Sequence, residues 1–538
     1  MDGILKNINK KDISYICILV IVTGILYFFA LGDMALTDPD ETFYAQTAKE
    51  MLNKGEWITP FIFDQPQFEK PIFYYWTIIA GYKIFGVSEF AARFFSAIFG
   101  ILGVIGTYFL GRFLFSKLCG FLSGLVLATC VQYFVLSRAC VTDMALAVSI
   151  LYCLLFLIVG LDNGLKRYYI CAAIMAGLAV LTKGPIGLFI PGVVYILYIT
   201  FSRQWGKIRS VPFFSCIAVF LLVAAPWYLI VTKIHGPSFI NEFFGFQNIT
   251  RFLEPEHRTG SSPLFYIPII MAGLFPWSLF LPLGIVGAFK KGISPGIKRY
   301  GKFLLIWFLV VFIFFSISRT KLVTYIFPLY PAMAIFVGRI WEQFINGFEG
   351  DKKYIKAMKW TYGIFMVLSF IAIIAVPVFV KMEYPEAFHG TVVTMIVFAV
   401  GILISLAALL RNKRQISFYS IVMLVMAILL PLNSFILPEI EQYESRKELS
   451  LLLKSLAKPT EAIGGECDNR RGIAYYTDNP NIEDINNFGD MRDFFMRKDR
   501  VWGIIKQKHY RTLVKEYPEI VSKPFARVGK MVLVKNNI

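Results

Sequence analysis

Four acidic residues follow directly after the first long apolar segment of the chain. They are Asp38, Asp40, Glu41 and Glu50, in LTDPDETFYAQTAKEML at residues 36 to 52. Helix capping explains two of them: Asp38 can cap a helix that has Pro39 at its first position, and Glu41 stands three residues on, as in a capping box. Capping does not explain Asp40, which has Tyr44 one turn later on the same face of the expected helix. A carboxylate in this position can act as a base or orient a hydroxyl group.

Other short segments next to aromatic, apolar sequence also carry charged or polar side chains. They supply Glu69 and Lys70 in FEKP, Arg138 and Asp143 in SRACVTDMAL, Lys183 in LTKGP, Arg251, Glu254, His257 and Arg258 in RFLEPEHR, and Arg319, Lys321 and Tyr325 in SRTKLVTY. Arginine suits phosphate by its planar fork and lysine as a point charge. Acids mixed with bases on one side of a membrane predict an outward-facing cavity for an anionic headgroup.

Each of these residues also has a purely structural interpretation. A charge at a helix end costs little, because its side chain can reach the membrane surface. Asp40 and Asp143 can be helix-end acids, and Glu69 with Lys70 can be a structural ion pair. His257 can be a solvated loop histidine, and Tyr325 an interface tyrosine. It is the grouping of these residues that favours a site.

The composition is that of an integral membrane protein. Of 538 residues, 57% are hydrophobic and only 17% are charged, whereas a soluble protein carries about a quarter charged residues. The net charge of +18 is concentrated in alternate loops, which is the positive-inside pattern of cytoplasmic loops. Aromatic residues interleaved with a basic groove are not evident, so nucleic acid is not an expected partner. The eight cysteines form no CxxC pair.

The elements that would position the charged residues are about thirteen membrane-spanning helices. They are expected to begin near Ile13, Phe90, Leu118, Asp143, Tyr168, Pro185, Val211, Leu264, Lys302, Thr324, Lys359, Thr391 and Ile416. With a cytoplasmic N-terminus, thirteen crossings leave the C-terminus outside. Two outer loops are long, at 32–89 and 234–263. The apolar piece PIFYYWTIIAGYKIF in the first is short for a span and predicts a helix in the outer interface. The alternative is a spanning helix, which would invert the later topology and lose the agreement with the positive-inside pattern.

The chain changes character near Pro438. We expect a transmembrane domain over residues 1–437 and a soluble, extracytoplasmic α/β domain over residues 438–538. In the latter, ESRKELSLLLKSL predicts an amphipathic helix, GIAYYT and KMVLVKN predict strands, and DMRDFFMRKDRVWGIIK mixes helix and strand signals. The first apolar segment lacks a small-residue cleavage site, which favours a retained helix over a signal peptide.

Five segments carry a family resemblance. DPDETFYA, FEKPIFYYW, GVSEFAARFFSAIFG, LTKGPIG and TKLVTYIFPLYPA resemble the bacterial polyprenyl-phosphate-sugar glycosyltransferases of the GT-C fold. The pattern is most similar to the lipid A 4-amino-4-deoxy-L-arabinose transferases, and more distantly to the protein O-mannosyltransferases. The resemblance covers about residues 10 to 440. It implies an α-helical polytopic GT-C domain in the cytoplasmic (inner) membrane, with the soluble α/β domain at its C-terminus.

The resemblance also implies roles for residues that match the motifs. Asp40 and Asp143 would be the catalytic acids. Lys70, Arg258 and Tyr325 would hold the carrier phosphate. Glu41, Tyr44, Lys183 and Lys321 would line the substrate cavity. Glu69 and His257 fall where the aminoarabinose transferases can hold a divalent metal ion, although two ligands alone are weak support for one. No other cofactor is implied.

One position departs from the pattern. The aminoarabinose transferases usually read DEARYA where this chain reads DETFYA, so Phe43 replaces an expected arginine. A phenyl ring cannot make the contacts of a guanidinium group. The departure concerns the identity of the sugar and the acceptor, and leaves the reaction class intact.

The function expected from these residues is inverting transfer of a sugar from undecaprenyl phosphate, or another polyisoprenyl phosphate, to an acceptor outside the cytoplasmic membrane. The acceptor would be lipid A, receiving aminoarabinose, or a protein or other glycan. With a polyisoprenyl-phosphate sugar as the donor, no nucleotide sugar is needed, and the sequence has neither a P-loop nor GxGxxG. A lipid-linked sugar flippase is the alternative from another class. It predicts ionisable residues deep within spans and paired broken helices, but these charges lie mostly at helix ends. A scaffold whose soluble tail binds a partner would have no use for them.

Overall fold

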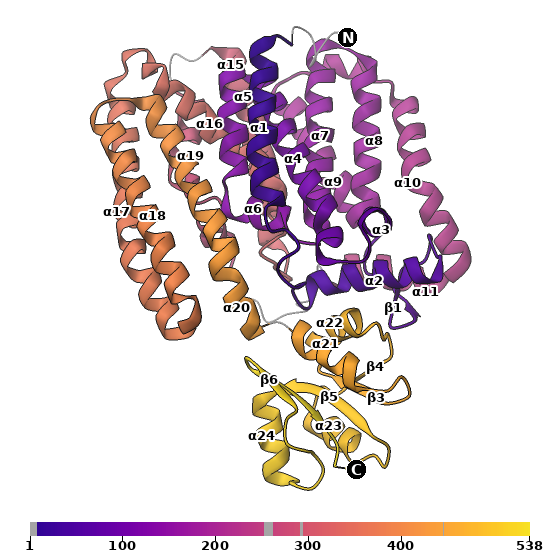
Figure 1. The fold of residues 1–538 in the computed structure, drawn as a ribbon. Coiled ribbons are helices and arrows are strands. Elements are labelled where there is room, and N and C mark those ends of the chain that lie inside the picture. Colours follow the sequence, from indigo (N-terminus) through magenta and orange to yellow (C-terminus); the bar gives the residue numbers. More distant parts are fainter. Residues whose placement is uncertain (1–7, 252–261, 291–293, 445, 538) are drawn as a thin grey trace.

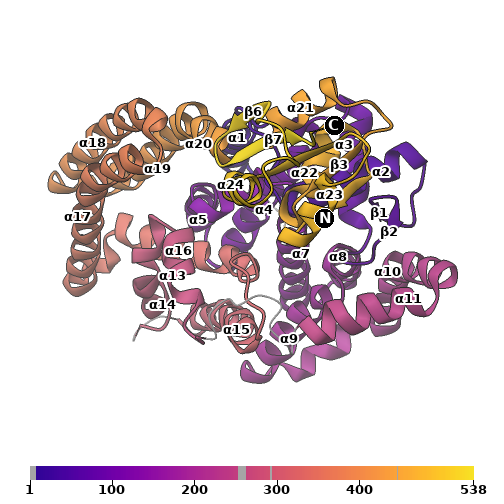
Figure 2. The same cartoon turned by 90° about the horizontal axis from the view of Figure 1, so that it is seen from below.

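The computed structural model describes residues 8–251, 262–290, 294–444 and 446–537. Most of the chain forms a bundle of long helices, and a smaller α/β domain lies beneath one end of it (Figure 1). The N-terminal helix begins at the opposite end of the bundle from this domain. Seen from below, the α/β domain lies over α2, α3 and α7, whereas α17 and α18 lie to one side (Figure 2).

Each of the thirteen predicted spans corresponds to a helix or to a broken pair of helices. They are α1(Lys10–Phe28), α4(Glu89–Leu114), α5(Lys117–Ala128) with α6(Val131–Ser137), α7(Thr142–Asn163), α8(Lys166–Lys183), α9(Ile186–Phe201), α10(Phe213–His235), α13(Tyr266–Gly273) with α14(Leu281–Ala288), α15(Pro295–Ile317), α16(Tyr330–Ile345), α17(Lys352–Glu383), α18(Phe388–Leu410) and α19(Arg414–Pro431). The short elements of this part are η1(Trp205–Ser210), α11(Pro237–Phe239), η2(Ile240–Thr250), η3(Trp277–Phe280), η4(Phe327–Leu329), η5(Gly347–Gly350), η6(Pro385–Ala387), η7(Leu432–Ile436) and α20(Leu437–Glu444).

The length and hydropathy of these helices identify a multi-pass membrane protein. Within the described residues, eight helices are long and apolar enough to cross a membrane, and ten if each of two bent pairs is one span. The bends are 70° between α5 and α6 and 113° between α13 and the η3–α14 segment. The helices α8, α9 and α16, at three other predicted positions, do not meet the same criterion.

Small residues allow the central helices to approach closely. A Cβ at Gly111 of α4 would lie 2.9 Å from the Cα of Gly120 in α5, and a Cβ at Gly106 would lie 3.0 Å from the side chain of Leu151 in α7. Close backbone approach is how helices associate in a membrane, where apolar burial gives little driving force. The ends are capped locally: Ser88 accepts a hydrogen bond from the backbone N–H of Ala91 at the start of α4.

The loop between α1 and α4 folds into α2(Asp40–Lys54), the short hairpin β1(Phe61–Ile62) and β2(Gln65–Pro66), and α3(Phe73–Phe85). The 13 residues of α3 are too few to cross a bilayer, and α2 and α3 lie together at the end of the bundle nearest the α/β domain (Figure 1). Gly55 ends α2 in the left-handed conformation, φ 66°.

The opposite end of the bundle is held together by ion pairs between its basic loops. Asp162, at the end of α7, binds Arg299 of α15 at 2.8 Å and Lys207 of η1 at 3.4 Å. Lys290, after α14, pairs with Asp351, before α17. The basic loops of the positive-inside pattern therefore gather at the end that carries the N-terminus.

The C-terminal domain is a five-stranded mixed sheet with helices. The strand order is β4-β3-β5-β7-β6, parallel among the first three and antiparallel at β5–β7 and β7–β6. Its elements are α21(Lys447–Leu456), β3(Ala462–Gly465), α22(Cys467–Thr477), β4(Ile482–Asp484), α23(Phe488–Phe495), β5(Val501–Lys506), α24(Gln507–Glu516), β6(Ala526–Val528) and β7(Met531–Lys535).

Sequence predictions for this domain were right except in one segment. The amphipathic helix and the KMVLVKN strand are confirmed by α21 and β7. The segment at residues 490–506, with its mixed signals, divides into the end of helix α23 and strand β5. The segment GIAYYT was predicted as a strand and is the second half of α22. It is buried on every side, because α22 packs between the sheet and the membrane domain. A short helix buried all round has the same continuous apolar pattern as a buried strand.

Candidate active site

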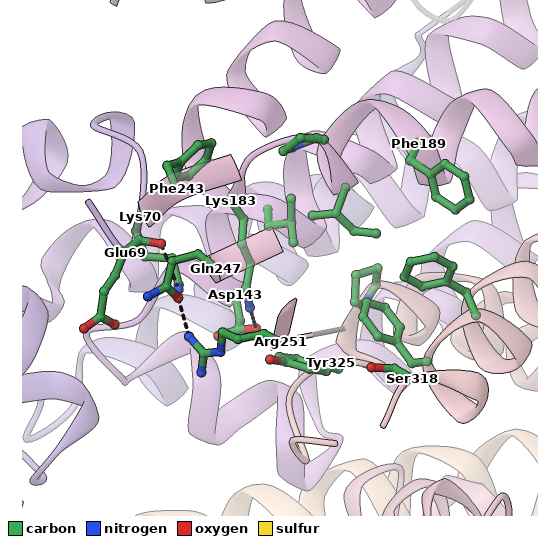
Figure 3. Close-up of a pocket in the computed structure, with 16 residues that line it drawn as sticks. Glu69, Lys70, Asp143, Lys183, Phe189, Phe243, Gln247, Arg251, Ser318 and Tyr325 are labelled. Atoms are coloured by element: carbon green, nitrogen blue, oxygen red, sulfur yellow. Dashed lines mark hydrogen bonds and ion pairs between the residues drawn. The ribbon is translucent and has the colours of Figure 1, made fainter. Parts of the chain in front are cut away.

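A cavity of about 330 Å³ lies where α7 begins and α8 ends, next to the segment that precedes α3. It is lined by Glu69, Lys70, Asp143, Leu146, Lys183, Pro185, Ile186, Phe189, Phe243, Gln247, Arg251, Phe314, Phe315, Ser318, Tyr325 and Pro328. Figure 3 shows Glu69, Lys70, Gln247, Asp143 and Arg251 toward one side, with Phe243 among them, and Phe189 at the other side. The cavity is thus amphipathic, with a charged half and an apolar half.

An ion pair joins two helix ends in the charged half. The Lys183 Nζ lies 2.7 Å from the Asp143 Oδ1. Asp143 is in the first turn of α7 and Lys183 is the last residue of α8, so each charge has the sign that its helix end favours. The Lys183 ammonium also lies 5.3 Å from the centre of the Tyr325 ring, a cation–π arrangement. The structure therefore brings Asp143, Lys183 and Tyr325 together, as the sequence predicts.

Lys70 adds a second ammonium group. Its Nζ donates a 3.1 Å hydrogen bond to the backbone carbonyl of Glu69. Burial lowers the pKa of Lys70 to about 8; the Glu69 carboxylate opposes this shift, and the positive charges of Arg251 and Lys183 add to it. The cavity therefore holds three cations close enough to repel one another, which an anionic ligand would relieve.

Arg251 and Gln247 complete the charged half. The Arg251 guanidinium donates a 2.6 Å hydrogen bond to the Gln247 Oε1, and the Gln247 amide donates at 2.8 Å to Glu242. Both side chains come from η2 and its end. The sequence singles out the loop through Arg251 but gives no signal for Gln247, since a lone glutamine after FFGF resembles any polar loop residue.

The apolar half consists of aromatic and aliphatic side chains from three helices. The rings of Phe189 in α9 and Phe314 in α15 lie 4.9 Å apart, centre to centre. Leu146 of α7 and Ile186 of α9 also line the cavity. An anionic headgroup with an attached apolar chain fits this division. These apolar residues could not be assigned from sequence, because any membrane helix carries similar ones.

Asp40 lies outside the cavity lining but within reach of its charges. It is the first residue of α2, and its side chain is exposed. Partial burial of the carboxyl group, and then the negative charge of Asp143, raise the pKa of Asp40; the positive charges of Arg471 and Lys183 oppose the shift. The two predicted catalytic acids are therefore electrostatically coupled.

Glu41 has a structural role, which corrects the prediction that it lines the substrate cavity. It is 4% exposed, and its carboxylate accepts hydrogen bonds from Arg93 at 2.8 and 2.7 Å. It also accepts from the backbone N–H groups of Cys140 and Thr37. The buried guanidinium of Arg93 draws Glu41 into the interior and away from the cavity.

Tyr44 and Lys321 likewise stand behind the cavity and do not line it. The Tyr44 ring is buried edge-on against Tyr74, 5.7 Å between centres. Lys321 is 2% exposed and donates to the carbonyl of Ser318, which does line the cavity. The Arg138 guanidinium donates hydrogen bonds to the backbone carbonyls at the C-terminal end of α1, including that of Phe29 at 2.6 Å. It therefore caps the end of this helix.

The start of α2 differs from the expected capping box. Pro39 is the N-cap and Asp40 the first helical residue, with no side-chain capping bond. The Asp38 carboxylate accepts instead from the Thr42 hydroxyl. Asp38 faces the C-terminal domain, next to Gly472 of α22.

The predicted residues Arg258 and His257 lie outside the described residues. Among those that the structure describes, no group of three or more His, Cys, Asp or Glu side chains could hold a metal ion. Glu69 has Lys70 beside it and Arg471 at 4.0 Å, and cations are poor neighbours for a metal.

Known proteins resemble this chain in sequence. The sequence model of the dolichyl-phosphate-mannose-protein mannosyltransferase family matches residues 69–230. The undecaprenyl phosphate-alpha-4-amino-4-deoxy-L-arabinose arabinosyl transferase of Enterobacter sp. (strain 638) is 28% identical over 412 residues, 73% of this chain and 72% of the relative. A second such transferase, from Proteus mirabilis, is 32% identical over 318 residues, 58% of this chain and 57% of the relative.

The whole fold is shared with a solved structure. The crystal structure of ArnT from Cupriavidus metallidurans bound to undecaprenyl phosphate superposes with a TM-score of 0.80, covers 98% of both chains and is 23% identical. Together these findings support a GT-C glycosyltransferase of the superfamily that includes lipid A aminoarabinose transferases and protein O-mannosyltransferases.

As a GT-C glycosyltransferase, the protein is an enzyme. The flippase and scaffold hypotheses are therefore set aside. The structural match covers 98% of the chain and therefore extends into the C-terminal domain, beyond the sequence resemblance.

Proposed function

We propose that this glycosyltransferase moves a sugar from undecaprenyl phosphate to an acceptor outside the cytoplasmic membrane, with inversion at the anomeric carbon. The observation that carries the proposal is the divided cavity. Three cations and a tyrosine gather at its charged half, and an apolar surface leads away between α9 and α15. This is the pattern that a phosphate carrying a long isoprenoid chain requires.

The charged half would hold the donor phosphate. Lys70, Lys183 and Arg251 surround one region of the cavity, with Tyr325 beneath Lys183; Arg258 is proposed to join them on the family resemblance. Asp143 fixes Lys183 by their ion pair. The isoprenoid chain would pass along Phe189 and Phe314 towards the bilayer.

In the chemical step, an oxygen of the acceptor attacks the anomeric carbon while the bond from that carbon to the carrier phosphate breaks. The bonding electrons leave with undecaprenyl phosphate, and Lys70, Lys183 and Arg251 stabilise the growing negative charge. If the acceptor is a hydroxyl, Asp40 takes its proton. If the acceptor is a phosphate, it is already a nucleophile, and Asp40 then positions it.

The proposed sugar is 4-amino-4-deoxy-L-arabinose and the proposed acceptor is lipid A. Support comes from the relatives, whose names specify an arabinosyl transferase and its undecaprenyl phosphate donor. Protein is the second candidate acceptor, because the mannosyltransferase family model matches residues 69–230, the segment that contains Lys70, Asp143 and Lys183.

The proposed orientation places the active site and the C-terminal domain, residues 438–538, outside. It is supported by the gathering of the basic loops at the N-terminal end of the bundle, joined by the ion pairs of Asp162. The positive-inside rule makes that end cytoplasmic. The active site lies at the other end, where α7 begins and α8 ends.

The test uses the purified enzyme in proteoliposomes with undecaprenyl phosphate–aminoarabinose. Lipid A is offered in one reaction and an unglycosylated secreted protein in another, and products are identified by mass spectrometry. Aminoarabinose on lipid A alone is the expected result. Sugar on the protein alone would favour the second acceptor. Consumption of the donor with neither product would contradict both.

A further inference from the structure

Helix α22 of the C-terminal domain is docked directly on α2, the helix that begins with Asp40. Lys49 of α2 donates a 2.6 Å hydrogen bond to the backbone carbonyl of Tyr475 and pairs with Asp478. On the neighbouring loop, the backbone N–H of Leu36 donates to the Tyr476 hydroxyl at 2.8 Å. These contacts hold the C-terminal domain at one place beside the active site.

The approach is closest where Gly472 meets Asp38. A Cβ at Gly472 would collide with the Asp38 carboxylate, so a larger residue there would require the Asp38 side chain to move. The residue before it, Arg471, is thereby set over the start of α2. Its guanidinium carbon lies 4.7 Å from the centre of the Phe43 ring, which is a flat, buried platform for a planar cation.

Arg471 has unused hydrogen-bonding capacity in this position. Within the described chain, its guanidinium donates one hydrogen bond, a long 3.4 Å contact to the Pro39 carbonyl, and lies 4.0 Å from the Glu69 carboxylate. By contrast, Arg93 donates to the Glu41 carboxylate and to three backbone carbonyls. A guanidinium has five N–H donors, so Arg471 can still grip a ligand with its fork.

The location of Arg471 distinguishes it from the donor cations. It lies beside Asp40 and does not line the cavity that contains Lys70, Lys183 and Arg251. An acceptor that reaches Asp40 from the side of the C-terminal domain would pass this guanidinium. Three groups therefore lie near one another: the Phe43 ring, the Arg471 guanidinium and the Asp40 carboxylate.

We propose that the C-terminal domain forms part of the active site, and that Arg471 binds a phosphate group of the acceptor beside Asp40. The proposal rests on the proposed function. It names the acceptor class as a phosphate-bearing lipid headgroup, and it gives the soluble domain a role in substrate selection. Phe43 stands where the family motif has arginine. In this chain its ring packs against Arg471, an arginine from the C-terminal domain.

The test compares full-length wild type with Arg471→Gln, Arg471→Lys and Arg470→Gln. Arg470 is the matched control, because it stands on the same helix but donates to the carbonyl of Ile482 within its own domain and packs on Phe63, 3.9 Å from the ring centre. Arg470→Gln removes the same charge from α22 without removing the group at Asp40.

Two measurements separate this proposal from the function itself. Binding of lipid A, and of lipid A with its phosphates removed, is measured without donor. KM is then measured for lipid A and for undecaprenyl phosphate–aminoarabinose. For Arg471→Gln we expect at least a tenfold loss of affinity for phosphorylated lipid A, a matching rise in its KM and an unchanged KM for the donor. Arg471→Lys should be intermediate and Arg470→Gln like wild type.

Equal binding of phosphorylated lipid A by wild type and Arg471→Gln would overturn the proposal. Equal losses of affinity in Arg471→Gln and Arg470→Gln would also overturn it, because they would mark a role in domain docking only. Equal affinity of wild type for the two lipids would overturn it as well. If wild type binds phosphorylated lipid A through Arg471 but transfers no sugar to it, the proposed function fails while the binding site stands.

Discussion

Asp40 and Glu41 are consecutive residues, yet their carboxylates belong to different parts of the molecule. The Glu41 carboxylate is buried and accepts two hydrogen bonds from Arg93, whereas the Asp40 side chain is exposed and coupled to Asp143. Glu41 fastens the loop between α1 and α4 to α4, and Asp40 is proposed to face the substrate. Substitution of Glu41 should therefore reduce stability, whereas substitution of Asp40 should reduce activity.

Glu41→Gln should destabilise the fold. It leaves the buried guanidinium of Arg93 without its counter-charge, and breaking a buried pair in this way costs about 3–5 kcal/mol. The measurement is thermal unfolding in detergent, followed by intrinsic fluorescence. Asp64→Asn, which removes a half-exposed partner of Lys54, should change stability by less than about 1 kcal/mol. Equal stability of Glu41→Gln and wild type would refute the anchoring role.

Donor binding should weaken at alkaline pH. The pKa of Lys70 is lowered to about 8, so its ammonium is present below that pH and is lost as the pH rises through it. Affinity for undecaprenyl phosphate should fall over this range, because the neutral amine no longer attracts phosphate. Lys70→Arg should remove the alkaline loss, since a guanidinium stays charged. An identical pH profile in both proteins would show that another group titrates.

Turnover should also fall at acid pH, for a different reason. The pKa of Asp40 is raised, by burial and then by Asp143. The carboxylate form is therefore lost at a higher pH than for an ordinary aspartate as the solution is acidified. Arg471 opposes this shift, so Arg471→Gln should move the acid limb of kcat/KM to still higher pH. Arg470→Gln should leave the limb in place, and an unmoved limb in both would contradict the coupling.

Lys183→Gln should weaken binding of undecaprenyl phosphate by about 10- to 100-fold, since a hydrogen bond to a charged group is worth about 1.5–3 kcal/mol. The loss leaves Asp143 without its 2.7 Å partner, which adds repulsion of the phosphate. Lys54→Gln is the control, because Lys54 pairs with Asp64 away from the cavity. The measurement is equilibrium binding in detergent. Similar affinity in Lys183→Gln and Lys54→Gln would place the phosphate elsewhere.

Phe314→Ala should reduce affinity for undecaprenyl phosphate but not for a short-chain prenyl phosphate. The ring forms part of the apolar half, and burial of such a side chain contributes about 1.5–3 kcal/mol. Phe214→Ala is the matched control, because Phe214 is 87% exposed on α10. If both chain lengths lost affinity equally, the apolar half would not hold the isoprenoid.

The membrane domain was predictable because the same requirement, an apolar segment long enough to cross the bilayer, repeats along it. Apolar blocks near twenty residues long locate the spans, and the short α3 is recognised by its length. The C-terminal segment GIAYYT was misassigned because α22 is buried against both the sheet and α2. Neither alternation nor helical periodicity survives in a segment with no exposed face.

The candidate site was predictable where its residues lie in the first outer loop or at helix ends beside aromatic sequence. Asp143, Lys183, Lys70 and Tyr325 were found in this way and do gather in space. Glu41 was misplaced because sequence cannot show that Arg93 of α4 binds it. Arg471 was missed because only tertiary docking of the C-terminal domain brings it to Asp40.

The most direct test of the account is release of undecaprenyl phosphate from its aminoarabinose conjugate by wild type, Asp40→Asn and Asp64→Asn, with lipid A as the acceptor. Asp64→Asn removes a carboxylate from the same outer loop, and both variants are checked for wild-type thermal stability. We expect release by wild type and Asp64→Asn, and a loss of at least 100-fold in Asp40→Asn with unchanged donor affinity. Undiminished release by a stable Asp40→Asn would contradict the assignment of this carboxylate to the reaction.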